Sequence, residues 1–562
     1  VVAKPAMQSL LMARCVVELM ASSGFPAGCC QLLLAPGVAV GEQLLPDSRI
    51  QALLFTGSLA TGHWLNRALA QREPCPLIAE TGGQNAMLVD ATALLEQVVD
   101  DVISSAFHSA GQRCSALRVL FVQEDIAEAL IAMLSGAMAE LVVGDPAFVA
   151  SDVGPLIDEQ ARQRCEEHCV YLQSQPRQKA RLLYACPLPE DSEGGYFFPP
   201  QLYEISSMSL LKEEVFGPIV HLIRFPAGAI DGVLEQINSS GYGLTLGIQS
   251  RIDTTCREVA QRAEVGNVYV NRNMVGAVVG VQPFGGRGLS GTGPKAGGAL
   301  YLSRLVRWPA SDLIDRNANR VFLGTEPSAH GAAILPADGW SQFSGGAIPV
   351  SLNKAQQRWA ARSGQNRISC IENFLQSTEL VGEPVELTGW GGVSDLLAVP
   401  QELPGPTGES NTYQLEGRGL ILLVLDEDSM GVVFLKHLAA ALVAGNAVLV
   451  LRHGTSPLAA RWQDLRTNLQ RAGVDGSLLH SAELDELFTL GAEAPIKGVC
   501  VAPGFAQYRE LAIALAARPG AICPLISALN FNCLVARLTY EKTITCNTAA
   551  AGGNASLLCL DG

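Results

Sequence analysis

Charged side chains are scarce in this sequence, and the basic ones are in the minority. Aspartate, glutamate, lysine and arginine together make up 17% of the 562 residues, and the formal net charge is −15. A nucleic-acid-binding surface would normally show a basic face, so this acidic balance argues against one. It also fits poorly with an anionic membrane as a partner. We therefore expect no nucleic-acid contacts from this segment.

The sequence also lacks C-x-x-C cysteine pairs and apolar runs long enough to span a membrane. The fifteen cysteines include no C-x-x-C pairs and no zinc spacing, so we expect no disulfide framework, no metal site and a reducing, cytoplasmic location. No signal peptide begins the chain. The apolar stretch 419–451 cannot span a bilayer, because charged and histidine side chains interrupt it. These are Asp426, Glu427, Asp428, Lys436 and His437.

Apolar residues, by contrast, are abundant at 48% of the chain, enough for large cores in two to four packed units. Short apolar strands such as 52–55 alternate with amphipathic helices such as the one after Ser58, which predicts βα units on a parallel sheet. This α/β pattern continues to about residue 310. A polar, irregular stretch follows up to about residue 410, and Pro404–Ser410 is a candidate linker.

The first residues suggest an incomplete sheet. Val1–Lys4 has the composition of the end of a buried β-strand, and neither an initiator methionine nor a partner strand precedes it. We therefore expect further residues upstream of Val1.

Two short segments near the end of the chain match the beginning. Residues 450–460 align with 3–13, and residues 523–528 with 75–80, at offsets of about 447 and 448 residues. A nearly constant offset suggests duplication of one βα domain. A chance match between apolar strands is the alternative.

Five short motifs carry the candidate chemistry. Each is weak alone, because a single cysteine usually packs in a core and a single glutamate usually lies on a solvated face. Together, in this order and spacing, they resemble the NAD-dependent aldehyde dehydrogenase superfamily. The motifs are Lys4–Ala6, Phe55–Ser58, Glu80–Gly83, Gly111–Ala116 and Lys212–Pro218.

The resemblance implies an α/β aldehyde dehydrogenase fold, with a truncated Rossmann-like NAD domain, an α/β catalytic domain, and a second, degenerate aldehyde-dehydrogenase-like α/β domain. We expect the truncated NAD-binding domain at 1–84 and the catalytic domain, with its substrate anchor loop, at 85–310. An irregular connecting region would occupy 311–410. The inactive domain and an oligomerisation tail would occupy 411–562.

Aldehyde oxidation explains why a cysteine and a carboxylate are needed. A thiolate must first attack the carbonyl carbon, which leaves a thioester after hydride loss. Cys114 is the candidate nucleophile, and the neighbouring Arg113 would favour its thiolate. Hydrolysis of the thioester then needs a general base that activates water, and the resemblance assigns this role to Glu80.

The sequence contains no G-x-G-x-x-G fingerprint for NAD, and the superfamily does not use one. By resemblance, Lys4 binds the adenosine ribose and Ser58 meets the diphosphate at a helix N-terminus. The other residues that the resemblance assigns to NAD are Thr56, Gly57, Gly82, Glu214 and Phe216.

One position departs from the superfamily. A glutamate that also binds the ribose usually follows Lys-Pro-Ala, and this chain has Met7. Losing one charged hydrogen bond costs on the order of 1.5–3 kcal/mol, so we expect weakened affinity for NAD.

Three longer segments, Phe107–Leu120, Gly266–Gly298 and Asn547–Leu558, look like the proline utilisation A family. That family couples a flavin-dependent proline dehydrogenase to oxidation of glutamate γ-semialdehyde. The resemblance implies this substrate, an upstream proline dehydrogenase domain that alone would hold FAD, and a homodimer. It leaves open membrane association of the longer protein. The substrate-binding residues that it implies are Phe107, Arg113, Ser115, Phe284, Gly297 and Gly298.

The second copy has lost these groups. Ala528 stands in place of Glu80, Asn530 falls near the position of Gly82, and Leu451 or Arg452 replaces Lys4. We expect 411–562 to be an inactive domain that packs as a lid over the active one.

Two alternative functions stay open. The chain could oxidise another small aldehyde. It could also be a catalytically dead scaffold, because the asparagine that donates to the oxyanion in this family would lie upstream, and losing such a donor costs on the order of 10²–10³ in rate.

Overall fold

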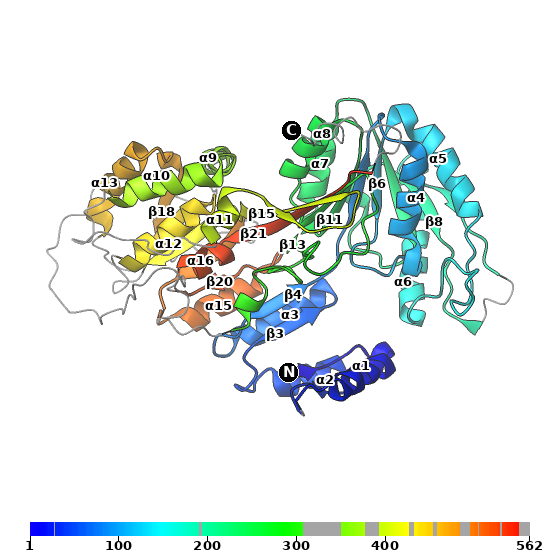
Figure 1. Ribbon diagram of the computed structural model, residues 1–562, viewed down its shortest axis with the longest axis horizontal. Helices are drawn as coiled ribbons and strands as arrows, with labels where there is room; N and C mark the ends of the chain where they lie inside the picture. The colour runs from blue at the N-terminus through cyan, green and yellow to red at the C-terminus, as the bar shows by residue number, and fades with distance from the viewer. Residues whose placement is uncertain are drawn as a thin grey trace.

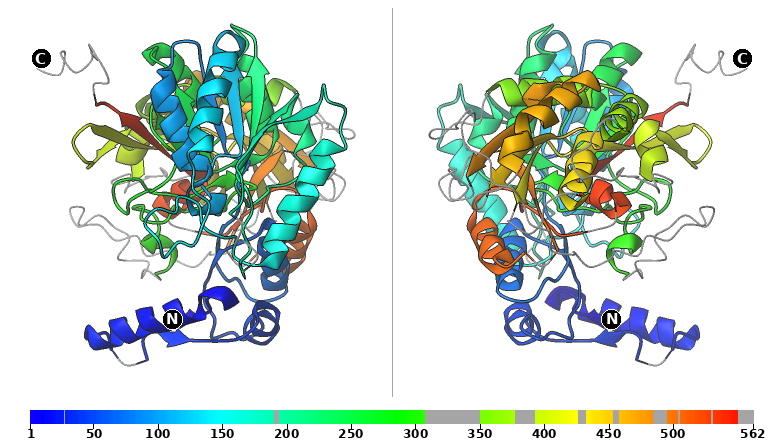
Figure 2. Two further views of the ribbon diagram at one scale, coloured as in Figure 1. Left: turned by 90° about the vertical axis from the view of Figure 1, so that its right-hand side faces the viewer. Right: turned by 90° about the vertical axis from the view of Figure 1, so that its left-hand side faces the viewer.

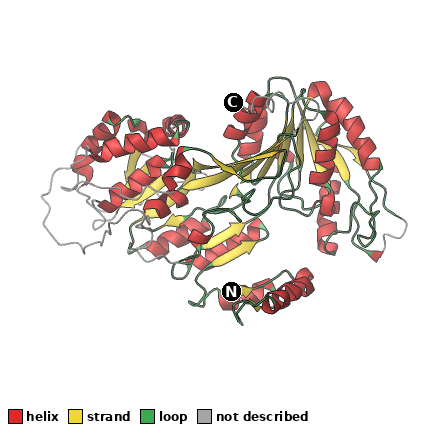
Figure 3. Ribbon diagram, in the orientation of Figure 1, coloured by secondary structure: helices red, strands yellow, loops and turns green. Residues whose placement is uncertain are grey.

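The computed structural model places most of the chain in two large sheets, with a smaller N-terminal part beside them (Figures 1 and 3). It describes residues 1–26, 28–189, 194–306, 350–376, 393–425, 432–452, 458–483, 495–503, 505–528 and 531–549.

The N-terminal part contains two separate pairs of parallel strands. β1 pairs with β2 and β3 pairs with β4, and within the described residues no strand joins the two pairs. The elements are β1 (Val2–Ala3), η1 (Met7–Ser9), α1 (Leu10–Ser22), β2 (Gln31–Leu32), α2 (Gly37–Leu44), β3 (Leu53–Thr56), α3 (Leu59–Ala70) and β4 (Leu77–Glu80).

Little of this part is buried, and helix α1 projects away from the rest of the molecule in both views of Figure 2. Helix α1 buries none of its residues. The strand predicted at Val1–Lys4 forms over Val2–Ala3, but it is not buried, since no described strand pairs with the side of β1 away from β2. Val2 is accordingly 46% exposed.

The larger sheet has ten strands in the order β14-β15-β21-β12-β11-β5-β6-β9-β8-β7. The strands from β21 to β8 run parallel. All four residues of β5 are buried, as expected for a parallel strand that is covered on both faces. The elements from this part of the chain are β5 (Ala86–Val89), α4 (Leu95–Ala106), η2 (His108–Gly111), β6 (Val119–Gln123), α5 (Glu124–Ala139), α6 (Glu159–Gln173), β7 (Ala180–Ala185), β8 (Gln201–Ile205), η4 (Met208–Leu210), β9 (Ile219–Phe225), α7 (Ile230–Ser239), β10 (Tyr242–Gly243), β11 (Thr245–Gln249), α8 (Asp253–Arg262), β12 (Asn267–Val270), β13 (Arg287–Gly288) and η5 (Leu302–Arg304).

The second sheet has five parallel strands in the order β18-β17-β16-β19-β20. In chain order this is 3-2-1-4-5, the doubly wound arrangement of Rossmann-like folds. The elements of the C-terminal part are α9 (Val350–Ala360), α10 (Gly364–Gln376), α11 (Val393–Ala398), β14 (Gln401–Leu403), β15 (Glu409–Gly417), β16 (Leu420–Leu425), α12 (Val432–Val443), β17 (Ala447–Arg452), α13 (Leu458–Arg471), η6 (Gly476–Leu478), β18 (Leu479–Glu483), β19 (Ile496–Val501), α15 (Tyr508–Ala517), β20 (Leu525–Ile526), α16 (Phe531–Arg537) and β21 (Thr539–Asn547).

Strand β21 belongs to the larger sheet although it comes last in the described chain. It pairs in parallel with β12, with Asn267 opposite Thr543, and antiparallel with β15 along its whole length. Figure 1 shows β15 and β21 reaching from the five-stranded sheet into the larger one. The larger sheet is therefore completed by residues from the far end of the chain.

The irregular connection predicted for 311–410 is wrong where the structure describes it. Helices α9 and α10 bury Leu352, Ala355 and Trp359 at helical spacing, together with Ile371 and other residues, in the core of the five-stranded sheet. The candidate linker Pro404–Ser410 forms instead the turn between β14 and β15. Residues 311–349 and 377–392 lie outside the described part of the chain.

One large hydrophobic core packs against each of the two sheets, and a small third cluster lies under α3. The predicted mixed α/β architecture is confirmed. No described helix combines the length and apolar character needed to cross a membrane. Among the described residues, no group of three or more histidine, cysteine or acidic side chains could hold a metal ion.

Candidate active site

The loop that leads to Cys114 has a strained backbone. Ser109, Ala110 and Gly111 follow one another with φ values of 57°, 53° and 66°, and only glycine adopts this left-handed region freely. A side chain at Gly111 is also excluded, because a Cβ there would lie 2.4 Å from the carbonyl oxygen of Gly217. Cys114 follows this tight turn at once.

Asn85, which directly precedes β5, holds the Cys114 loop in place through side-chain hydrogen bonds. Its buried Nδ2 donates to the carbonyl oxygens of Cys114 (2.6 Å) and Ala116 (2.9 Å). Its Oδ1 accepts from the backbone N–H of Thr245 at 3.2 Å. Asn85 thereby orients the main chain on both sides of the cysteine, a role that no sequence motif indicated.

Arg118 is the second support that the sequence did not reveal. This buried guanidinium donates through Nη1 to the carbonyl oxygens of Gly111 (2.7 Å) and Gly217 (3.0 Å). Through Nη2 it donates to the carbonyl oxygen of Arg113 and to Oε1 of Glu214, at 3.2 and 3.1 Å. It ties the cysteine loop to the segment that carries Glu214.

The Cys114 thiol is partly buried. Burial raises its pKa, and the negative charges of Glu80 and Glu214 raise it further. The backbone N–H groups of Ser115 and Cys114 offset part of this rise. Since the Glu80 charge acts on the sulfur, the structure brings the two predicted catalytic groups into one site.

The predicted effect of Arg113 on the thiol is not found. The Arg113 side chain is exposed, and its Nε donates to Oγ of Ser109 at 3.1 Å. The main causes of the shift in the pKa of Cys114 are burial, Glu80 and Glu214.

Glu80 ends strand β4 with its carboxylate held over the glycine-rich loop 283–298. Oε2 accepts from the backbone N–H of Gly286 at 2.8 Å, while Oε1 is buried and has no hydrogen-bond partner among the described residues. A Cβ at Gly285 or Gly291 would lie 2.9 Å from Oε1, so these glycines make room for the carboxylate. Burial raises the pKa of Glu80 to about 8. This is the range in which a carboxylate serves as a general base near neutral pH.

Glu214 lies directly against the Glu80–Gly83 motif. Its Oε2 accepts from the backbone N–H of Gly83 at 3.1 Å, and a Cβ at Gly82 would lie 1.6 Å from the same oxygen. The absence of a side chain at Gly82 therefore leaves room for the Glu214 carboxylate. Phe216 is 43% exposed, and the Arg118 guanidinium lies 5.2 Å from its ring centre.

The other residues predicted to bind a dinucleotide lie at the ends of β1 and β3. Ser58 is the N-cap of α3, and its Oγ accepts from the backbone N–H of Thr61 at 3.3 Å. Thr56 and Gly57 precede it and are exposed. They leave the N-terminus of a 12-residue helix open to an anion.

Lys4 follows β1 and is exposed, and a Cβ at Gly37, the first residue of α2, would lie 3.7 Å from its Nζ. Met7 begins η1 nearby and is 48% exposed. The predicted ribose-binding end is thus built on a strand pair separate from the one that carries Glu80.

The two predicted anchor glycines differ in what their backbones offer. Gly297 has φ 70°, and among the described residues its N–H has no acceptor. The N–H of Gly298 already donates to the carbonyl oxygen of Lys295 at 3.1 Å. Only the Gly297 N–H is available to a ligand in this geometry.

The predicted aromatic and hydroxyl contacts also differ in exposure. Phe107 is completely buried at the end of α4, and Ser115 is buried beside the nucleophile. Phe284 is partly exposed, and its backbone pairs with that of Ala296. Phe107 supports the wall of the site from within the core rather than presenting its ring at the surface.

Lys295 holds the glycine-rich loop and was not singled out from the sequence. It is buried, and its backbone N–H donates to Oε2 of Glu541 at 2.7 Å. Its ammonium joins the loop to β12 and β21. The acceptors of Nζ are the carbonyl oxygens of Gly266 and Pro283, Oδ1 of Asn267 and Oγ1 of Thr543.

Residues 1–308 match the model of the aldehyde dehydrogenase family. The chain belongs to the aldehyde dehydrogenase family. This confirms the predicted fold class, and members of the family generally use NAD or NADP.

Relatives extend the match over nearly the whole chain. Bifunctional protein PutA of Escherichia coli strain K12 is 41% identical over 577 aligned residues, which cover 99% of this chain and 39% of the relative. A 1-pyrroline-5-carboxylate dehydrogenase of Geobacillus kaustophilus is 34% identical over 309 residues, 54% of this chain and 58% of that protein. The chain therefore spans about two fifths of the length of the PutA relative.

The fold matches a solved structure over a similar extent. Proline utilization A from Corynebacterium freiburgense superposes with a TM-score of 0.65 at 21% sequence identity, covering 98% of this chain and 47% of that chain. At this identity the likeness shows the fold alone, but it includes the five-stranded sheet as well as the larger one.

Proposed function

We propose that this chain oxidises L-glutamate γ-semialdehyde, the open form of 1-pyrroline-5-carboxylate, to L-glutamate. The observation that carries the proposal is the joint placement of the Cys114 thiol and the unpaired Oε1 of Glu80 in one site. The similarity to a 1-pyrroline-5-carboxylate dehydrogenase over 54% of the chain supports this aldehyde.

The reaction follows from these two groups. The Cys114 thiolate forms a bond to the carbonyl carbon and converts the aldehyde into an alkoxide. When bound, NAD⁺ supplies the hydride acceptor, and loss of hydride leaves a thioester on Cys114. Glu80 then removes a proton from water, the hydroxide adds to the thioester carbon, and the carbon–sulfur bond breaks to release the acid and the thiolate.

The residues present fit NAD as the cofactor. The open N-terminus of α3 behind Ser58 suits a diphosphate, and Lys4 is exposed for a ribose hydroxyl. Thr56 and Gly57 would let the backbone approach the diphosphate. Glu214 would bind the nicotinamide ribose, and it would first have to exchange its contacts with Gly83 and Arg118. Gly82 and Phe216 would border that end of the cofactor.

The substrate carboxylate would bind the free N–H of Gly297, since a backbone N–H without a partner is an anion donor. Gly298 would contribute by leaving space, and Phe284, Ser115 and Arg113 would surround the aliphatic chain.

We also propose that the C-terminal part is an inactive second copy that covers the active one. The element starts support a duplication, because corresponding helices and strands in the two parts begin 443–449 residues apart, three of the pairs at 448. Ala528 stands where the first copy has Glu80, so the copy offers no general base. Asn530 and the end of the predicted tail, 550–562, lie outside the described residues. The matching starts are Leu10 with Leu458, Gln31 with Leu479, and Leu77 with Leu525.

We also propose that a proline dehydrogenase domain with FAD lies upstream on the same polypeptide. We propose further that the protein forms a homodimer. The name and greater length of the bifunctional relative support the first of these.

The two catalytic roles predict different kinetics for two variants. Cys114→Ser should lower NADH formation from glutamate semialdehyde by about 10³-fold or more, because no thioester forms. Glu80→Gln should still release about one NADH per chain in a rapid burst, with slow turnover afterwards. Stopped-flow absorbance at 340 nm separates the two, with the exposed Cys15→Ser as the matched control. Full activity of Cys114→Ser would refute the proposal.

A further inference from the structure

A cavity of about 380 Å³ lies between the N-terminal part and the five-stranded sheet, and Cys114 does not line it. Helix α3 and the start of β4 form one side, and α15, β20 and α16 form the other. Its volume is within the range of small-molecule sites.

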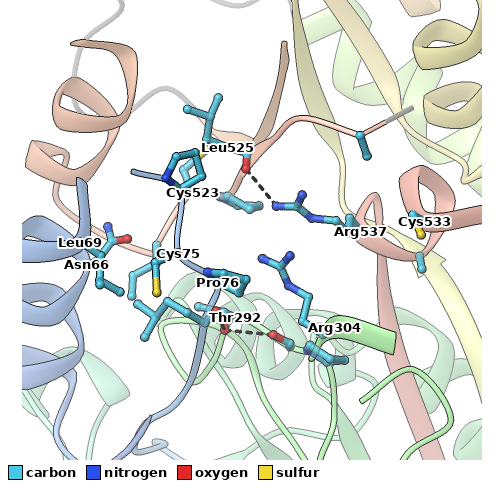
Figure 4. Close-up of a pocket in the computed structure, with 18 of the residues that line it drawn as sticks. Asn66, Leu69, Cys75, Pro76, Thr292, Arg304, Cys523, Leu525, Cys533 and Arg537 are labelled. Carbon is cyan, nitrogen blue, oxygen red and sulfur yellow. Dashed lines mark hydrogen bonds between the residues drawn. The ribbon is translucent and has the colours of Figure 1, made fainter. Parts of the chain in front are cut away.

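Three arginines from separate parts of the chain line this cavity. Arg304 ends η5, Arg418 follows β15 and Arg537 ends α16. Figure 4 shows the guanidinium ends of Arg304 and Arg537 pointing into the same space. Burial lowers the pKa of both Arg304 and Arg537, and the positive charge of Arg418 lowers both pKa values further. The charge of Arg304 also lowers the pKa of Arg537. The three charges therefore lie close enough to repel one another.

Two of the side chains are held in place by backbone oxygens. Arg537 Nη2 donates to the carbonyl oxygen of Leu525 at 2.9 Å. Arg418 donates to the carbonyl oxygens of Arg537 (2.7 Å) and Thr292 (3.3 Å), and its guanidinium lies 4.3 Å from the ring centre of Tyr540. These contacts orient the guanidinium groups, and the other N–H donors of each one have no acceptor among the described residues.

No acid forms a salt bridge with this cluster within the described part of the chain. None of the three arginines forms a salt bridge there, and the Arg304 guanidinium makes no hydrogen bond with a described residue. The carboxylate that lines the cavity is Glu541, and its two oxygens already accept from Tyr413 and from the backbone of Lys295. Buried cations are normally paired, because an unpaired one loses its hydration without compensation.

We propose that this cavity binds a small anion with at least two negative charges, a dicarboxylate or a phosphate compound, through Arg304, Arg418 and Arg537. Planar guanidinium groups match both anions, since each presents paired N–H donors to two oxygens. The bound anion would join the N-terminal part to the five-stranded sheet and stabilise their packing by mass action.

The test measures binding of two probes to the whole chain without aldehyde or NAD. Inorganic pyrophosphate and glutarate are each titrated at constant ionic strength, and calorimetry and the unfolding temperature report binding. We expect saturable binding of at least one probe. Binding of pyrophosphate alone assigns the site to phosphate compounds, and binding of glutarate alone assigns it to dicarboxylates.

Arg304→Gln is the discriminating variant, because the Arg304 side chain makes no hydrogen bond with the described residues that the substitution would break. It should weaken probe binding by about tenfold or more. The exposed Arg257→Gln, whose nearest acid Asp253 is 3.9 Å away, should leave binding unchanged. Equal affinity in wild type and Arg304→Gln, or the absence of saturable binding of both probes, would overturn the proposal.

If Arg304→Gln fails to fold, cysteine alkylation of the wild-type chain tests the same proposal. Cys75 lines the cavity, whereas Cys29 is exposed elsewhere. The bound probe should slow alkylation of Cys75 several-fold, as followed by peptide mass spectrometry, and leave the rate at Cys29 unchanged. Unchanged alkylation of Cys75 at high probe concentration would contradict binding there.

Discussion

At the scale of single residues, the site depends on the Glu80 carboxylate, for which the described residues provide few hydrogen-bond donors. Among the described residues, Glu80 accepts one hydrogen bond, from Gly286, and its other oxygen is buried without a partner. An ionised carboxylate in this position is costly, which is why burial raises the pKa of Glu80 to about 8. The same property makes it a strong base once it has lost its proton.

This pKa predicts the pH dependence of thioester hydrolysis. The base must be ionised, so steady-state turnover should rise about tenfold per pH unit below pH 8 and level off above it. Multiple-turnover rates between pH 5.5 and 9.5 measure this limb. Glu80→Gln should lose the limb, and a wild-type midpoint near pH 5 would show that Glu80 is not the base.

The anchor glycine gives a second prediction at this scale. Gly297→Ala places a side chain where φ is 70° and where its Cβ would meet Val279 at 3.2 Å, so the free N–H should be displaced. We expect KM for glutamate semialdehyde to rise about tenfold or more, and KM for butyraldehyde, which lacks the carboxylate, to change little. Equal changes for both aldehydes would remove the anchor and favour another small aldehyde as substrate.

The site residues that the sequence predicted differ from those that it did not in the groups that they bind. Cys114 and Glu80 lie in short motifs, because their chemistry requires particular neighbours in the chain. Arg118 and Lys295 bind mainly backbone oxygens from distant segments. Any residue type presents such an oxygen, so no pattern in the sequence marks these partners.

At the scale of elements, β21 joins the two parts of the molecule through a buried lysine. Lys542 Nζ donates to the carbonyl oxygens of Ala260 and Ala263 at the end of α8, at 2.9 Å each, and pairs with Glu416 on β15 at 2.6 Å. One ammonium therefore satisfies a helix C-terminus and a carboxylate. The sequence predicted the alternation of strands and helices, but it could not show that this late strand enters the first sheet.

Removing this lysine should be costly. Lys542→Met leaves the helix oxygens unpaired and Glu416 without one of its two cations, so we expect a loss of about 3–5 kcal/mol in the free energy of unfolding. Urea unfolding measures it, with the exposed Lys179→Met as control. A loss below about 1 kcal/mol would mean that β21 does not need this contact.

At the scale of the whole molecule, the C-terminal part contributes both strands and cover to the catalytic part. Gly417 on β15 and Thr539 on β21 lie directly opposite each other, so a two-residue turn could join them as a hairpin. This geometry allows the two contributions to be separated by deletion.

The variant that separates these two contributions keeps residues 1–306, 401–417 and 539–549. A flexible linker joins the first two segments, and an Asn-Gly turn joins the last two. We expect it to be folded and more stable to heat than a chain that ends at residue 306, which loses β14, β15 and β21. It should be less stable than the full chain, because the five-stranded cover is gone. Circular dichroism and amide exchange at β12 compare the three chains. Equal stability of the two shortened chains would show that the hairpin alone does not complete the sheet.

The position of β21 also affects how the protein is synthesised. Lys295 and its acceptor Thr543 are 248 residues apart, and a ribosome adds about 5–20 residues per second. On the order of ten seconds or more therefore pass in which the nascent chain displays β12 as an open strand edge, a known starting point for aggregation. Chaperone demand during translation should accordingly fall once the β21 codons have been read.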